Sequence, residues 1–325
     1  TSGGAYINFA AAVEMVLRNG RMKKYGDIVL GEETGDPRNF KTWDEFWNAY
    51  VKQHMLFLRT AFTQQYIVNN LRAQHFAQPM GSAMHDLCMK HCIDLHQTHI
   101  PEGIDFGYFE YMGLGTVVDS LSAIKKLVFE DKKLTMDEVI KAIDANFEGY
   151  EDIQKLCFGA PKPGNDIEDV DQLTRRFFRD VERIYRSHGP DYFGYEAHMD
   201  PFSLSYHNYF APMTGALPNG RQKGVALTDA SVSAMPGTDV NGSTALIKSA
   251  AQAIDTVRNN CNHMNMKFLP SALEGPSGTR MLLNLIKTYF DLGGGHIQFN
   301  CVSSETLCDA QEHPQNYKNL VVRVA

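Results

Sequence analysis

Histidine and cysteine side chains concentrate in one short stretch of the sequence, where a metal site would first be sought. The stretch contains His85, Cys88, His91, Cys92, His96 and His99. One rigid helix can offer a metal ion only two ligands, three or four residues apart, so a closed site would need ligands from elsewhere. A cysteine on a helix is usually a small core residue. We therefore expect no bound metal in this chain.

Two glycine-rich segments could be taken for phosphate-binding turns. Gly293-Gly294-Gly295 precedes an expected strand, whereas a phosphate-binding turn follows a strand and opens a helix. The segment 274–278, with the sequence Glu-Gly-Pro-Ser-Gly, is not followed by the lysine of a P-loop. We interpret the first segment as a helix C-cap and the second as a turn. Neither is expected to be catalytic.

Three tight-turn sequences lie at the ends of apolar segments in the last third of the chain. They are Pro218-Asn219-Gly220-Arg221, Pro236-Gly237-Thr238-Asp239 and Asn241-Gly242-Ser243-Thr244. We interpret them as structural turns rather than substrate contacts. Asp239 and Thr244 are expected to cap a helix that starts near Ala245.

Composition restricts the class of protein. Of the 325 residues 43% are hydrophobic, enough for a large core, and the formal net charge of −7 leaves no basic surplus for nucleic acid. We find no run of about eighteen apolar residues that could span a bilayer and no basic, apolar leader. The six cysteines are spread along the chain rather than densely paired. We expect a soluble, cytoplasmic protein with reduced thiols and no membrane partner.

The two ends suggest a segment of a longer chain. The sequence opens with Thr1 and no start methionine, and it closes at Ala325 within an expected strand. An unprotected strand end without a following turn is a poor natural terminus.

Apolar periodicity defines the elements that must position any site. Helices are expected over 6–17, 42–73, 82–95, 117–130, 135–146, 166–186, 244–257 and 279–292, with a short helix after Gly149 and a helix stop at Gly20. Thr42 with Glu45, and Thr135 with Glu138, look like capping boxes. Strands are expected over 202–209, 264–269, 296–302 and 320–324. This alternation predicts an α/β layer or barrel.

The C-terminal third carries a more specific pattern. The runs His296 to Asn300, Asp309 to Pro314 and Val322 to Ala325 resemble the approach to the radical site in glycyl radical enzymes of the pyruvate formate-lyase-like type. Further matches to that family, in the same order along the chain, lie at 119–129, 216–221 and 239–245. Chance is a poor explanation for ordered matches spread over most of the chain.

The resemblance implies a fold and a place for the chemistry. Residues 1–325 would be a single partial domain, the C-terminal half of a ten-stranded α/β barrel with helices outside. Residues 296–325 would approach the glycyl radical loop, with the radical glycine just after Ala325 and the catalytic cysteine in a loop before Thr1. None of the six cysteines has the context of that loop, so no catalytic residue is expected within the chain.

The implied cofactor is a protein-derived glycyl radical, installed by a radical-SAM activating enzyme. In the family the glycyl radical passes to a cysteine, whose thiyl group abstracts hydrogen from a small-molecule substrate. Such radicals need shielding from water and oxygen, which a closed barrel interior supplies. A homodimer is implied by analogy with the family alone.

Substrate contacts are expected on the segment Glu196 to Tyr209, where strand alternation would place one set of side chains inward. The polar set is favoured over the set that contains Leu204 and Tyr206. The resemblance adds Thr1 and Tyr6, which would lie just after the expected cysteine loop, and His198, which lies beside Met199. The candidate substrate-binding residues are Thr1, Tyr6, His198, Phe202, Ser203, Ser205 and His207.

The expected reaction is radical cleavage of a carbon–heteroatom bond, as in the lyases and dehydratases of the family. The stretch 239–278 resembles the carbon–sulfur lyases that split isethionate, although the run near Met199 lacks the arginine expected to bind a sulfonate. Arylacetate decarboxylation and radical addition to fumarate are alternatives. A non-catalytic barrel subunit that binds a partner is an alternative of another class.

Overall fold

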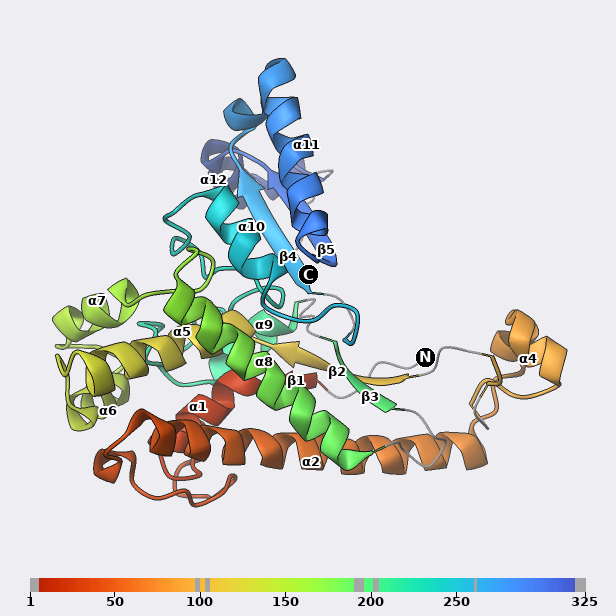
Figure 1. Cartoon of the computed structure of the whole chain (residues 1–325), viewed down its shortest axis with the longest axis horizontal. Coiled ribbons are helices and arrows are strands. Elements are labelled where there is room, and N and C mark those ends of the chain that lie inside the picture. The colour runs from red at the N-terminus through yellow and green to blue at the C-terminus, as the bar shows by residue number, and fades with distance from the viewer. Residues whose placement is uncertain are drawn as a thin grey trace.

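The computed structural model describes residues 6–96, 100–102, 106–189, 196–200, 205–259 and 262–318. Within these ranges the chain combines helices with two parallel sheets (Figure 1). The α/β class expected from the sequence is confirmed. No helix in the described ranges has the length and apolar character needed to cross a membrane.

The first sheet consists of three parallel strands in the order β1, β2, β3. They are Tyr6–Asn8, Phe106–Met112 and Glu196–Asp200. Parallel neighbours cannot be joined by a tight hairpin, so the connections between them carry helices. The sheet therefore joins segments that are about a hundred residues apart in the sequence.

The second sheet pairs β4 (His263–Phe268) with β5 (His296–Cys301), with His263 opposite His296. Its apolar face packs on α10 (Ser243–Ala251) and α11 (Gly275–Asp291). This face and the helices that cover it share the buried residues Leu246, Ile247, Met264, Met266, Leu285 and Tyr289. The result is a small second core, which forms the upper lobe in Figure 1.

The glycines after α11 end that helix, as predicted. Gly293 has φ +96°, and the N–H groups of Gly293 and Gly294 donate to the carbonyls of Phe290 and Tyr289 at 3.0 and 2.9 Å. A left-handed residue at this position closes the helix and redirects the chain. Here it leads directly into β5.

Two buried helices support the first sheet. α1 (Phe9–Leu17) follows β1 without a loop, and Asn8 caps it by accepting the N–H of Ala11 at 3.3 Å. Every residue of α1 and of α5 (Leu114–Ile124) is buried, and the two helices pack together. Gly20, at φ +82°, accommodates the chain reversal after α1, as predicted.

α2 (Trp43–His75) begins at the predicted capping box, in which Thr42 and Glu45 exchange two hydrogen bonds of 3.3 Å. Its first half packs on the core. Its second half leads away from the body to α3 (Pro79–Ala83) and α4 (Asp86–His91) (Figure 1). This extension exposes large apolar side chains: Tyr66, Ile67, Leu71, Phe76, Met80, Met84 and Met89.

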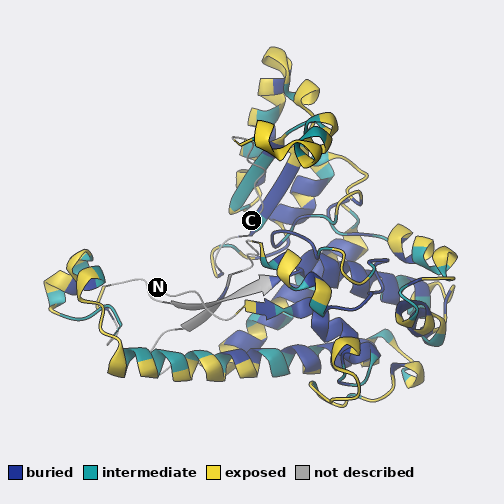
Figure 2. Ribbon diagram, turned by 180° about the vertical axis from the view of Figure 1, so that it is seen from behind, coloured by how far each residue is buried: buried dark blue, intermediate teal, exposed yellow. Residues whose placement is uncertain are grey.

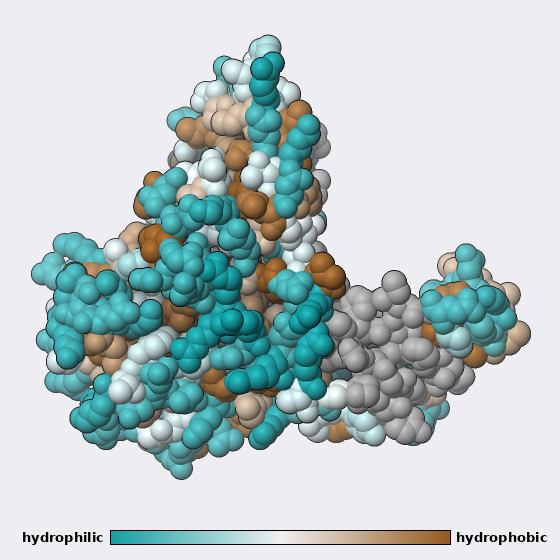
Figure 3. All heavy atoms as spheres, viewed as in Figure 1, coloured by the Kyte–Doolittle hydropathy of each residue, from teal (hydrophilic) through white to brown (hydrophobic). Residues whose placement is uncertain are grey.

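Five further α-helices and one π-helical turn lie in the described ranges. They are a π-helical turn (Lys125–Glu130), α6 (Met136–Asp144), α7 (Glu151–Gly159), α8 (Glu168–His188), α9 (Tyr206–Tyr209) and α12 (Ser304–Glu312). The capping box of Thr135 and Glu138 is confirmed at the start of α6. α8 buries one face and presents a hydrophilic outer face, visible in Figure 3. Figure 2 shows buried residues gathered in the body of the molecule.

Several predicted elements are wrong. The helix expected over 82–95 is replaced by α3 and α4, because His85 is extended and caps α4 by accepting the N–H of Cys88 at 3.4 Å. The strand expected over 202–209 is wrong in its described part, where Tyr206–Tyr209 forms one helical turn. The helix expected from Tyr6 starts only at Phe9, because Tyr6–Asn8 pairs with β2.

Other predictions fail or lie outside the described residues. Asp239 and Thr244 do not cap α10, whose N-cap is Gly242 at φ +85° with no side-chain hydrogen bond. β2 was not predicted, because pairing with distant strands leaves no local signal, whereas β3 falls in the first part of the segment from Glu196 to Tyr209 that was expected to alternate as a strand. The strand expected over 320–324 lies outside the described residues.

His54 of α2 is enclosed by aromatic rings in the main core. It is 2% exposed, and its ring centroid lies 3.9 Å from that of Phe9. Its Nδ1 lies 3.2 Å from the Tyr50 hydroxyl, while its Nε2 has no hydrogen-bond partner among the residues that the structure describes. Burial lowers the pKa of His54 from 6.5 to about 3. The folded protein therefore holds this imidazole neutral.

This histidine predicts sensitivity to acid. Between pH 6.5 and about 3 the unfolded chain binds a proton that the folded protein does not, so stability falls as the pH falls. We expect the wild type to lose about 2–3 kcal/mol more than His54→Phe between about pH 7 and about pH 4.5. Urea denaturation of both proteins at the two pH values measures this difference. Equal losses would contradict the prediction.

Candidate functional site

Residues 205–233, here called the junction segment, connect the first sheet to the second. Leu227 donates its N–H to the His207 carbonyl at 3.3 Å. The Thr228 hydroxyl accepts the N–H of Thr116, in the first turn of α5, at 3.0 Å. At the other end, Val232 donates to the carbonyl of His263 on β4 at 3.2 Å. The junction segment therefore fixes the two sheets relative to each other.

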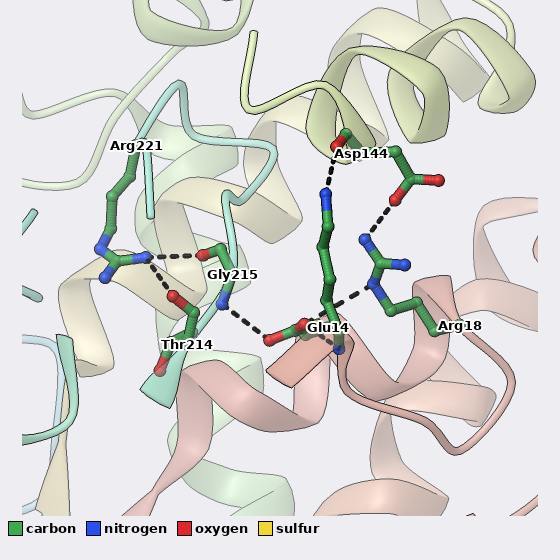
Figure 4. A network of polar contacts seen from close by, with 7 residues as sticks. Glu14, Arg18, Asp144, Thr214, Gly215 and Arg221 are labelled. Atoms are coloured by element: carbon green, nitrogen blue, oxygen red, sulfur yellow. Dashed lines mark hydrogen bonds and ion pairs between the residues drawn. The ribbon is translucent and has the colours of Figure 1, made fainter. Parts of the chain in front are cut away.

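Glu14 is the only charged residue in α1, and it is 1% exposed. Its carboxylate accepts the N–H of Gly215 at 2.9 Å and that of Lys23 at 2.8 Å (Figure 4). Arg18 lies 3.6 Å from the same carboxylate and also contacts Asp144. A buried charge is tolerated only when it is paired and hydrogen-bonded. These contacts therefore hold α1 firmly to the junction segment.

Arg221 holds the junction segment from the other side and is 1% exposed. Its guanidinium donates to the carbonyls of Gly215 and Val225 at 2.7 Å and to that of Ala211 at 2.9 Å. Burial lowers the pKa of Arg221 to about 10, with Glu14 acting in the opposite direction. The side chain thus closes the loop 211–225 around itself through backbone contacts.

A second cluster of buried charged side chains lies where the family motif 119–129 meets the family motif 216–221. Asp119 of α5 lies close to Asn219 and to Lys162, and Lys162 donates to the Cys157 carbonyl at 2.8 Å. Burial raises the pKa of Asp119 to about 6, while Lys162 and Asn219 counteract the rise. The turn at 218–221 is therefore tied to α5 through a buried carboxyl group.

Asn165 attaches the third family motif, residues 239–245, to the loop before α8. Its side chain donates to the Thr238 carbonyl at 2.8 Å and accepts the N–H of Asn241 at 3.1 Å. Asn241 in turn donates to the Asn165 carbonyl at 2.8 Å. These contacts agree with the interpretation of the sequences as structural turns. The prediction that Asp239 and Thr244 cap α10 was wrong.

Aromatic rings gather where β1 meets α9. The rings of Tyr6 and Tyr206 are stacked, with centroids 3.9 Å apart and planes 17° apart. Tyr209 and Phe210 contact Tyr206 with centroids at 5.8 and 6.2 Å. At the other end of β1, Asn8 donates to the Thr214 hydroxyl at 2.9 Å. Both ends of this short strand are therefore held by the junction segment.

The structure describes four of the seven predicted substrate-binding residues. Tyr6 begins β1, and His198 lies on β3 opposite Tyr108. Ser205 is exposed at the N-cap of α9, while His207 is 5% exposed with its Nε2 2.9 Å from the Asn208 side-chain nitrogen. Thr1, Phe202 and Ser203 lie outside the described residues.

Sequence reasoning missed Tyr206, Glu14 and Arg221. Tyr206 was assigned to the less favoured side of a strand, and the structure instead places it on a helix against Tyr6. Glu14 could have been found as a single carboxylate within an apolar helix, because such a group needs buried partners. Arg221 was noticed only as part of a turn.

The described histidine side chains of the histidine and cysteine stretch make contacts within α3, α4 and the segments beside them. His96 Nδ1 lies 2.9 Å from the Phe76 carbonyl, and His91 lies 3.3 Å from Glu102. Cys88 is buried, as expected for a core cysteine, whereas Cys92 is exposed. His99 is not among the described residues. Within the ranges that the structure describes, no three His, Cys, Asp or Glu side chains are arranged to hold a metal.

The second sheet presents polar side chains on the face opposite its core. His263 and His296 are neighbours with ring centroids 4.6 Å apart, and burial together with His296 lowers the pKa of His263 to about 4. Asn265 donates to Asp229 of the junction segment at 3.1 Å. The start of this face therefore offers the neutral imidazole of His263 and the amide group of Asn265.

Comparison with known families assigns the chain. The pyruvate formate lyase-like family model matches residues 1–211, and the glycine radical model matches residues 228–325. The chain therefore belongs to the pyruvate formate lyase-like family of glycyl radical enzymes. The boundary between the two matches falls within the junction segment.

Individual relatives match along nearly the whole chain. Isethionate sulfite-lyase of Desulfovibrio desulfuricans is 59% identical over all of this chain and 39% of its own length. Indoleacetate decarboxylase of Tractidigestivibacter scatoligenes is 34% identical over 99% of this chain and 38% of its own length. The crystal structure of hydroxyproline dehydratase from Clostridioides difficile superimposes with a TM-score of 0.91 at 35% identity, covering 98% of this chain and 40% of that one.

These matches confirm the family and the fold expected from the sequence. The chain spans about 40% of the length of its relatives, and over that part it has the fold of a glycyl radical enzyme.

The Glu14 contacts predict a large loss of stability on neutralisation. Glu14→Gln keeps the size of the side chain but replaces one acceptor with an amide group that faces a backbone N–H. We expect the free energy of unfolding to fall by about 2–3 kcal/mol, because a buried donor is left unpaired. Urea denaturation at neutral pH measures the change.

Glu33→Gln is the matched control. The Glu33 carboxylate is 60% exposed and pairs with Arg21 at 3.4 Å. An exposed pair of this kind contributes little, so this variant should change stability by less than about 0.5 kcal/mol. Similar effects of the two substitutions would show that the Glu14 contacts to the junction segment are unimportant.

Proposed function

We propose that the protein containing residues 1–325 is a glycyl radical lyase that cleaves a carbon–heteroatom bond of a small organic substrate. The observation that carries this proposal is the 59% identity to isethionate sulfite-lyase, against 34% and 35% for the decarboxylase and the dehydratase. Enzymes of one family that act on different substrates differ in the residues that line the site. The higher identity favours the carbon–sulfur bond of isethionate as the bond cleaved.

The radical glycine and the catalytic cysteine are proposed to flank residues 1–325, and together they supply hydrogen-atom abstraction. The residues of this chain would bind the substrate and keep water out. Tyr6, at the start of β1, is the best supported contact because it is 38% exposed while the next residue, Ile7, is buried. The other proposed contacts are Thr1, His198, Phe202, Ser203, Ser205 and His207.

The sulfonate group of isethionate would need a cationic or hydrogen-bonding partner. β3 has the sequence Glu-Ala-His-Met-Asp and contains no arginine. His198 stands where a charged guanidinium would have been the stronger ligand. We therefore expect the sulfonate to be bound mainly by a residue outside β3.

The proposal includes partners and a compartment. A radical-SAM activating enzyme would install the glycyl radical, and the protein would act as a homodimer. The cysteines Cys88, Cys92, Cys157, Cys301 and Cys308 are free thiols. Free thiols suit a reducing compartment, which supports the cytoplasm as the site of action.

Anaerobic activation tests the function. We expect the full-length protein, incubated with a radical-SAM activating enzyme and S-adenosylmethionine, to give the doublet of a glycyl radical in electron paramagnetic resonance. The activated protein should then release sulfite from isethionate, and a reaction without the activating enzyme is the control.

Two results would contradict the proposal. No doublet despite an activating enzyme that works on another family member would favour a non-catalytic barrel subunit. A doublet with no sulfite release, combined with turnover of hydroxyproline or an arylacetate, would retain the radical mechanism and reject the carbon–sulfur bond as its target.

A further inference from the structure

The rings of Tyr6 and Tyr206 form a stacked pair between β1 and α9. Its centroid separation of 3.9 Å and angle of 17° describe rings in parallel contact. Tyr6 belongs to a three-residue strand, and its side chain lies at the edge of the core rather than inside it. A tyrosine at a strand start has two rotatable side-chain bonds, so its ring needs a neighbour to hold one orientation.

Tyr206 is well fixed for that purpose. It opens α9, and the next residue, His207, is buried and accepts the N–H of Leu227 through its carbonyl at 3.3 Å. The rings of Tyr209 and Phe210 contact Tyr206 from within the same turn and just after it. The junction segment that carries Tyr206 is itself clamped by Glu14 and Arg221.

We propose that Tyr206 is a positioning residue that holds the Tyr6 ring in one orientation at the start of β1, ready to contact the substrate. The inference rests on the proposed function, in which Tyr6 is a substrate contact. Tyr206 acts through its ring face rather than through its hydroxyl, because the contact is a stack. Its loss removes this stacking contact from the Tyr6 ring.

Tyr206→Ala and Tyr206→Phe separate the ring from the hydroxyl group. In the alanine variant we expect the Michaelis constant for isethionate to rise about tenfold with kcat within about twofold, because an interaction made equally in the ground state and transition state is lost. In the phenylalanine variant both constants should stay near wild type, because the ring remains. A Tyr206→Phe variant as impaired as Tyr206→Ala would overturn the inference.

Nitration of Tyr6 by tetranitromethane, measured by peptide mass spectrometry, tests the contact without any activity. Loss of the covering ring should raise the nitration rate of Tyr6 about threefold or more in Tyr206→Ala, and not in Tyr206→Phe. Tyr25, which is 42% exposed and has the Lys24 ammonium 5.7 Å from its ring centroid, gives an internal reference in every sample. An unchanged Tyr6 rate in Tyr206→Ala would overturn the inference.

A double-mutant cycle then links the two tyrosines in the activated protein. If Tyr206 acts only through Tyr6, adding Tyr206→Ala to Tyr6→Ala should change the Michaelis constant by less than about twofold. Additive effects would overturn the inference. Failure of the proposed function is seen separately, as a wild-type protein that forms no radical or releases no sulfite.

Discussion

The fold depends on how two buried charged side chains hold the backbone of Gly215. Glu14 accepts its N–H at 2.9 Å, and Arg221 donates to its carbonyl at 2.7 Å. A Cβ atom at this position would lie 2.9 Å from the Glu14 carboxylate, so a larger residue would displace it. The two charges are compensated through one peptide segment, which lets both be buried. α1 and the junction segment consequently behave as one unit.

That unit determines where the candidate site residues lie. β1 is held at Asn8 by Thr214 and at Tyr6 by Tyr206, and both partners belong to the junction segment. The same segment reaches β4 through Val232. The family matches meet inside this segment, which therefore joins the pyruvate formate lyase-like part to the glycine radical part. A rigid junction segment would hold the substrate contacts in a fixed geometry, as radical chemistry requires.

Local signals in the sequence predicted local structure well. The capping boxes at Thr42 and Thr135, and the glycine stop after α11, depend on neighbouring residues only and were found where expected. Tertiary contacts left no such signal: Asp119 and Asn219 meet across a hundred residues of sequence, and the stack on Tyr206 depends on a helix where alternation favoured a strand. The family and the half-barrel followed from motif order, which local periodicity alone could not supply.

The amide hydrogen of Gly215 gives the most direct test of the central claim. Its exchange with deuterium can be followed by mass spectrometry with residue-level fragmentation, with the exposed turn glycine Gly224 as the reference. If the Glu14 and Arg221 contacts hold the junction segment to α1, Gly215 should exchange as slowly as the amides of α1, at least about a thousandfold slower than Gly224. Exchange of Gly215 at the rate of Gly224 would contradict the account.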